Sequence, residues 1–136
     1  MSELVLVFTH FADRELAQRA ARKMIRSHLA ASVQIAPLEK IHYWRGEWRQ
    51  DTKWTLGLMT TKSRYRALEA ALRAMHPDEE EEPPPIYGAA CDRALPVYAD
   101  WVRDRVMDSE SASGVRPSQA LNFYDTNPPS SIPPEE

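Results

Sequence analysis

The sequence predicts an α+β fold, with one antiparallel sheet and helices packed against it. Short runs of β-forming apolar residues alternate with two longer stretches whose apolar residues recur at helical spacing. Two strand-like runs also flank a single Arg45-Gly46 turn, which predicts a long hairpin. The length of 136 residues suggests one domain, and 43% hydrophobic with 27% charged residues is ordinary for a globular chain.

A strand and a helix begin the chain. Residues 4–9 (LVLVFT) form a continuous apolar run, as expected for a central strand that is buried on both faces. Asp13 is placed to cap the helix that follows. The apolar stripe of this helix consists of Leu16, Ala17, Ala20, Ala21, Met24 and Ile25. Its other side is polar and mostly basic, so we expect that side to face solvent.

The middle of the chain predicts the hairpin and a second helix. Residues 32–35 and 40–44 read as one strand interrupted at Pro37, which marks a bulge or a sheet edge because proline cannot donate a ladder hydrogen bond. Residues 47–61 return as the partner strand. A helix over residues 63–75 follows and ends before Pro77, because proline disfavours helix in the residue that precedes it. Its inner face is expected to hold Tyr65, Leu68, Leu72 and Met75.

The last elements are a short strand and a terminal helix. Residues 78–85 (DEEEEPPP) predict an acidic, proline-rich loop, and residues 86–91 a short edge strand. Pro96 suits the first turn of a helix over residues 95–107. The inward face of that helix is expected to carry Val97, Tyr98, Trp101 and Val102. The resulting order, β-α-β-β-α-β plus a helix, is the ferredoxin-like split βαβ arrangement.

Composition divides the chain into residues 1–107, one folded domain, and residues 108–136, a Ser/Pro-rich acidic tail that we expect to be flexible. The net charge is −3 and the body is close to neutral, so we expect no nucleic-acid partner. No apolar run approaches the length of a membrane span, so we expect no membrane partner. The single cysteine, Cys91, permits no internal disulfide and fits a cytoplasmic protein.

The aromatic hairpin predicts self-association. A strand over residues 33–44 would span about 40 Å at ~3.3 Å per residue, whereas a domain of this size is only about 35 Å across. The hairpin should therefore project beyond its own core. We expect its aromatic side chains to pack against other copies of the chain in a closed ring. These residues are Tyr43, Trp44, Trp48 and Trp54. The alternative is that the tryptophans fold back onto the helices as ordinary core.

Five segments, in order, carry a family resemblance. They are LVLVFTHFADRELAQRAARKMI at 4–25, LAASV at 29–33, YWRGE at 43–47, TTKSRYRALEAALRAMHP at 60–77 and ALPVYADWV at 94–102. In this order they resemble the CutA divalent-cation tolerance proteins, and the resemblance extends over roughly residues 3–106. The resemblance implies a homotrimer of ferredoxin-like subunits, similar in architecture to the PII signalling proteins. It also implies an association with tolerance to copper and other divalent metals.

The chain departs from the family pattern around the expected ligand site. Ser32 stands where the family has a cysteine in its LAACV segment, and Met59 stands where it has a lysine. The segment after His76-Pro77 is longer and lacks the family's tyrosine. We therefore expect a metal site that is altered or degenerate.

Candidate metal ligands are His76 and Glu79. Imidazole suits copper or zinc, and the neighbouring carboxylates could supply oxygen ligands. The alternatives are that His76 caps the end of its helix and that the acids 78–82 form a solvated charge run. His42 on the hairpin and His10 are interpreted as an exposed strand residue and a structural residue.

The sequence contains no Gly-rich phosphate loop and no nucleophile motif, so we expect no enzymatic activity. A second function remains open beside metal tolerance. This is a PII-like sensor that binds an anionic metabolite at inter-subunit clefts through Arg22, Arg26 or Arg45.

Overall fold

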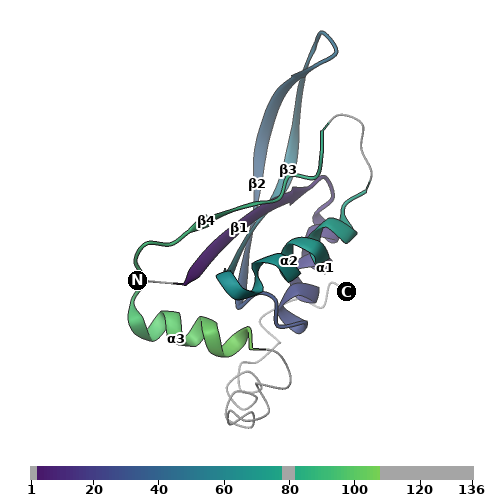
Figure 1. The fold of residues 1–136 in the computed structure, drawn as a ribbon. Coiled ribbons are helices and arrows are strands. Elements are labelled where there is room, and N and C mark those ends of the chain that lie inside the picture. Colours follow the sequence, from purple (N-terminus) through teal and green to yellow (C-terminus); the bar gives the residue numbers. More distant parts are fainter. Residues whose placement is uncertain (1–2, 78–81, 108–136) are drawn as a thin grey trace. The chain divides into compact units, whose positions relative to one another are not determined.

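The computed structural model describes residues 3–77 and 82–107. The elements are β1 (Leu4–Phe11), α1 (Arg14–Arg26), β2 (Ser32–Trp44), β3 (Glu47–Thr61), α2 (Lys62–Met75), β4 (Tyr87–Ala90) and α3 (Pro96–Arg105). The four strands form one antiparallel sheet in the order β2-β3-β1-β4 (Figure 1). This order confirms the predicted ferredoxin-like α+β fold. The predicted tail, residues 108–136, lies outside the described residues.

The main core lies between the sheet and the pair α1–α2. Alternate residues of β1, among them Val7, point towards these helices because successive strand side chains face opposite sides. The stripe of α1 is confirmed at Ala17, Ala20, Ala21 and Met24, all of which are buried. Ile25 was predicted in the same stripe but is 38% exposed, because it lies at the edge of the buried face in the last turn.

The terminal helix α3 packs against the opposite face of the sheet. Leu4 and Met59, whose side chains alternate with those facing α1 and α2, contact its buried residues. Those buried residues are Ala99, Val102 and Val106, spaced as one helical face. The predicted inward face was therefore wrong in part: Val97 and Tyr98 are exposed. The apolar residues of α3 itself point to several sides of the helix. Their spacing in the sequence therefore does not identify the side that is buried.

The β2–β3 hairpin extends past the rest of the sheet (Figure 1). Strand β1 accompanies β3 only as far as the pair Phe11–Trp54. From the pair Leu38–Lys53 to the turn, β2 and β3 pair with each other and with no other described strand. Pro37 lies on β2, an edge strand, as predicted, and does not interrupt it.

The turn at the hairpin tip uses left-handed backbone at both central residues. Arg45 has φ 54° and Gly46 has φ 76°. This is the conformation that a two-residue hairpin turn needs to match the twist of its strands. Glycine adopts it without penalty, whereas the Cβ of Arg45 costs roughly 1–2 kcal/mol there. Among the described residues, none of the helices has the length and apolarity needed to cross a bilayer.

Candidate functional site

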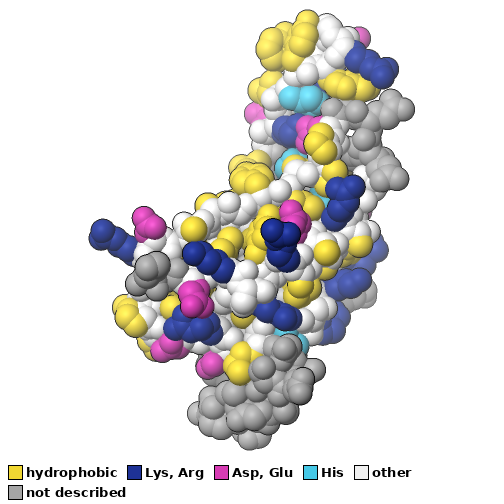
Figure 2. Space-filling view, in the orientation of Figure 1, with side chains coloured by type: hydrophobic (Ala, Val, Ile, Leu, Met, Phe, Trp, Pro, Cys, Tyr) yellow, Lys and Arg dark blue, Asp and Glu magenta, His cyan; other side chains and the backbone are white. Residues whose placement is uncertain are grey.

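A cavity of about 190 Å³ lies where the base of the hairpin meets the end of β1 and the segments on either side of the α2–β4 connection. Its ionisable lining combines three imidazoles, two ammonium groups and carboxylates. The side chains that matter for the chemistry are His10, Lys40, His42, Lys53, His76 and Glu82. In Figure 2, histidine side chains follow the hairpin below its apolar tip.

Strand register brings the two lysines together. Lys40 of β2 pairs with Asp51 of β3, and Leu38 pairs with Lys53. Paired residues and residues two apart on a strand share one face, so Lys40 and Lys53 are diagonal neighbours on the face of the hairpin away from α1 and α2. His10 of β1 lies on this same face.

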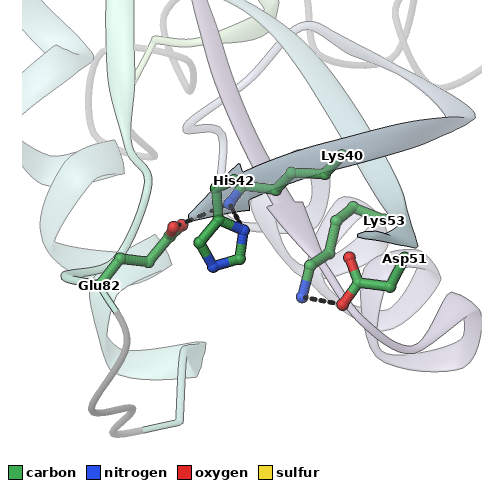
Figure 3. A network of polar contacts seen from close by, with 5 residues as sticks. All are labelled: Lys40, His42, Asp51, Lys53 and Glu82. Carbon is green, nitrogen blue, oxygen red and sulfur yellow. Dashed lines mark hydrogen bonds and ion pairs between the residues drawn. The ribbon is translucent and has the colours of Figure 1, made fainter. Parts of the chain in front are cut away.

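Two separate groups of polar contacts, one at each lysine, lie at the cavity (Figure 3). The Nζ of Lys40 donates hydrogen bonds to Oε1 of Glu82 at 2.8 Å and to Nδ1 of His42 at 3.2 Å. The Nζ of Lys53 forms an ion pair with Asp51 at 3.7 Å. The lysine side chains are only 24% and 16% exposed, so these contacts are shielded more than ordinary surface pairs.

The surroundings set the charge of two further groups. Burial raises the pKa of Glu82, but the hydrogen bond and charge of Lys40 outweigh it, so this pKa lies below its ordinary value. Burial lowers the pKa of His10, and the charges of Lys53 and Lys40 lower it further against the opposing effect of Glu82. At neutral pH the site therefore holds an ionised Glu82 and a neutral His10.

His76, the predicted metal ligand, is tied to β1. Its Nε2 is hydrogen-bonded to Oγ1 of Thr9 at 2.7 Å, and its ring stacks on Phe11 with centroids 4.2 Å apart. It also ends α2, where its backbone N–H donates to the carbonyl of Arg73. Burial, and then the charge of His10, lowers the pKa of His76. These contacts agree with the interpretation of His76 as a helix-end residue.

The metal prediction itself stays a prediction. Within residues 3–77 and 82–107, no group of three His, Cys, Asp or Glu side chains is arranged to hold a metal ion. The second proposed ligand, Glu79, lies outside the described residues. His76 therefore has no described carboxylate or imidazole set to complete a metal centre with it.

The aromatic residues predicted to form an interface divide into two groups. Trp48 and Tyr43 lie at the tip, 74% and 60% exposed, and contact each other edge to face at 5.0 Å. Trp44 is half-buried beneath the guanidinium of Arg45, 4.5 Å from its ring centroid. Trp54 lies lower on β3 and packs against the main core. In the single chain, Tyr43 and Trp48 do not fold back onto the helices.

Sequence reasoning did not find that Lys40 and Lys53 are diagonal neighbours, nor that His10 lies on the same face. Nothing in the sequence around any of the three residues links it to the other two. The available signal was the run of polar residues at 49–53 opposite Lys40 and His42, which becomes informative only once the hairpin register is known.

The split βαβ sheet with its long β2–β3 hairpin defines a class, the ferredoxin-like proteins with an extended central hairpin. Residues 5–105 match the sequence model of one family in this class, described as CutA1 divalent ion tolerance protein. The chain belongs to this family, and the resemblance noted from its sequence is confirmed.

Several relatives carry the name divalent-cation tolerance protein CutA. The protein from Thermotoga maritima is 29% identical over 104 residues, which is 76% of this chain and 100% of the relative. The protein from Thermus thermophilus is 31% identical over 105 residues, which is 76% of this chain and 97% of the relative. CutA of Synechococcus elongatus PCC7942 superposes with a TM-score of 0.72 at 25% identity, over 79% of this chain and 93% of that one. CutA1 of Shewanella sp. SIB1 superposes with a TM-score of 0.70 at 28% identity, over 76% of this chain and 95% of that one.

Proposed function

We propose that this chain acts in the tolerance of, or response to, divalent metals as a closed homotrimer, without enzymatic activity and in the cytoplasm. Family membership supports the metal association. The observation that carries the assembly is the hairpin: it extends beyond β1 and presents Tyr43 and Trp48 to solvent.

The hairpin offers enough apolar surface to drive association. Besides the two tip aromatics, Leu38 and Ile41 are 55% and 57% exposed on the same ribbon. Burying a large apolar side chain stabilises by roughly 1.5–3 kcal/mol, so four half-exposed residues supply several kcal/mol per chain. In a closed ring, the apolar hairpin surface of every copy is buried against a neighbour. In a monomer, the apolar hairpin and its edge strand stay exposed, which favours aggregation.

Light scattering coupled to size-exclusion chromatography tests the assembly. The wild-type chain should elute as one species of three times the chain mass. Trp48→Glu should shift the population towards monomer, because it places a charge in the proposed contact. Val97→Glu is the matched control: this residue is 68% exposed on α3, and its substitution should leave the trimer intact. A wild-type monomer at micromolar concentration contradicts the proposal.

For the metal we propose weak binding of copper or another borderline cation through His76, with Glu79 as an oxygen ligand. The support is chemical: imidazole suits such metals, while the substitution of Ser32 for the family's cysteine removes a thiolate. Cu²⁺ titration of wild type, His76→Ala and the exposed control His28→Ala tests this. Loss of binding confined to His76→Ala supports the assignment. Tighter binding by Ser32→Cys would indicate that the family-type geometry persists.

The second candidate, a PII-like sensor of an anionic metabolite, is favoured by the absence of a three-ligand metal group among the described residues. It would use Arg22, Arg26 or Arg45 at subunit clefts. A thermal-shift screen separates the two functions. Stabilisation by Cu²⁺ or Zn²⁺ supports metal response, and stabilisation by an organic anion supports the sensor.

A further inference from the structure

We propose that the cavity at the base of the hairpin binds a small dianion between Lys40 and Lys53, and that the carboxylate of Glu82 holds part of this place while the ligand is absent. The proposed anion contacts use neither the aromatic tip nor His76, which lines the same cavity but is hydrogen-bonded to Thr9. The site is built within one chain and does not rest on the metal assignment.

The first support is the placement of two like charges. As diagonal neighbours on one sheet face, the two lysines have Cβ atoms within about 7–8 Å, and their long side chains reach the same cavity. Both lysine side chains are largely shielded from water. Burying like charges together is unfavourable unless an anion lies between them. The arrangement is therefore suited to a ligand that carries more than one negative charge.

The second support is that the hydrogen-bonding capacity of the Lys53 ammonium group is not fully used. An ammonium group has three N–H donors. Within the described part of the chain, that of Lys53 makes one ion pair, to Asp51, and no hydrogen bond. The distance of 3.7 Å is too long for a hydrogen bond, and the Asp51 side chain is 54% exposed. A shielded cation with unused donors thus lines the cavity.

The third support is that Lys40 already recognises an oxyanion. It holds the carboxylate of Glu82 at 2.8 Å. Glu82 lies in the connection between α2 and β4 and belongs to no helix or strand, so it can leave without breaking a backbone ladder. A dianion can bond to both lysines, whereas Glu82 brings one charge to one of them. The incoming ligand can therefore replace this carboxylate on Lys40.

The same contacts disfavour a cation between the two lysines. Two ammonium groups would repel a metal ion, and Nδ1 of His42, which a metal would need, accepts a hydrogen bond from Lys40. The volume of about 190 Å³ is below the roughly 300–1,000 Å³ of pockets for drug-sized ligands. The chemistry therefore points to a small oxyanion, either phosphate or a short dicarboxylate.

Calorimetric titration of the full chain with inorganic phosphate, and separately with malonate, tests the site at constant ionic strength. Lys40→Gln and Lys53→Gln should each weaken binding by about tenfold, a typical loss for one charged hydrogen-bonding partner. Glu82→Gln should tighten it by about threefold to tenfold, because it removes the internal competitor. Lys23→Gln, on exposed α1, and Glu39→Gln, on the other face of β2, are the matched controls and should change little.

The proposal depends on whether Glu82→Gln raises or lowers the affinity for the anion. Unchanged or weaker anion binding by this variant overturns it, as does an equal loss in Lys23→Gln or an absence of binding by both anions. If Zn²⁺ affinity rises in Lys40→Gln and falls in Glu82→Gln, the cavity is a cation site. Should Lys40→Gln fail to fold, the double variant Lys40→Gln/Glu82→Gln removes both charges together. It should fold and bind the anion about tenfold more weakly than Glu82→Gln does, and affinity equal to that of Glu82→Gln contradicts the proposal. If phosphate binds more tightly than malonate, the natural ligand is a phosphate, and if malonate binds more tightly, it is a short dicarboxylate.

Discussion

The hydrogen bond between Thr9 and His76 links β1 to the end of α2, and a pair of matched substitutions can measure it. Thr9 is 1% exposed, and its hydroxyl lies 2.7 Å from the His76 ring. Thr60 faces the same side of the sheet, from β3, and is fully buried, but its hydroxyl has no partner among the described residues. Threonine-to-valine is nearly isosteric, so each substitution removes a hydroxyl with little change of volume.

The two variants should change stability in opposite directions. Thr9→Val removes a hydrogen bond and leaves the imidazole nitrogen unpaired, which costs about 1–2 kcal/mol because His76 is only half-buried. Thr60→Val removes a buried hydroxyl that is not compensated, so the free energy of unfolding should stay constant or rise by about 1 kcal/mol. The expected difference between the variants is therefore about 1–3 kcal/mol.

Urea denaturation at one fixed protein concentration measures this difference, since the proposed assembly would make stability depend on concentration. Equal slopes of the two transitions would show that the denatured states are comparable. If Thr60→Val destabilises as much as Thr9→Val, shape and not hydrogen bonding determines the effect, and the reasoning is wrong.

Two further predictions concern pH and the turn. The pKa values of His10 and His76 are both lowered, chiefly by burial, so the unfolded chain binds protons more readily than the folded one. The stability that these groups support is present above the unfolded value of 6.5 and is lost as pH falls through their folded values. Thermal denaturation across this range should show the loss, and a smaller loss in His76→Gln. Gly46→Ala should destabilise by about 1–2 kcal/mol because φ is +76° there, whereas Gly57→Ala, whose Cβ would meet side chains at an ordinary 3.9 Å, should be nearly neutral by the same denaturation assay.

The elements and their order could be predicted from the sequence because each has a local signal. Pro37 indicated an edge strand, and Arg45-Gly46 indicated the hairpin turn, from residue type alone. The inward face of α3 could not be assigned, because Val97 and Val102 are equally apolar and only the sheet decides between them. Helical periodicity likewise overstated the burial of Ile25.

The contacts of the candidate site could not be predicted, because they join residues far apart in the chain. His76 bonds to Thr9 across 67 positions, and Lys40 meets Glu82 across 42. No local pattern encodes such pairs. They follow from the strand order and the hairpin register, which the sequence constrains only through the turn.

The assembly and the anion site can be separated by one variant. Trp48 pairs with Tyr43, and both lie on the face of the hairpin opposite to Lys40 and Lys53, since paired residues share a face and successive residues alternate. Trp48→Glu should therefore dissociate the trimer and leave phosphate affinity within about twofold of wild type, as expected for sites that share no contact. The measurement is the phosphate titration repeated on the dissociated variant, with light scattering to establish its mass. Loss of phosphate binding together with the trimer would show that a neighbouring copy completes the cavity, and the claim that one chain suffices would be wrong.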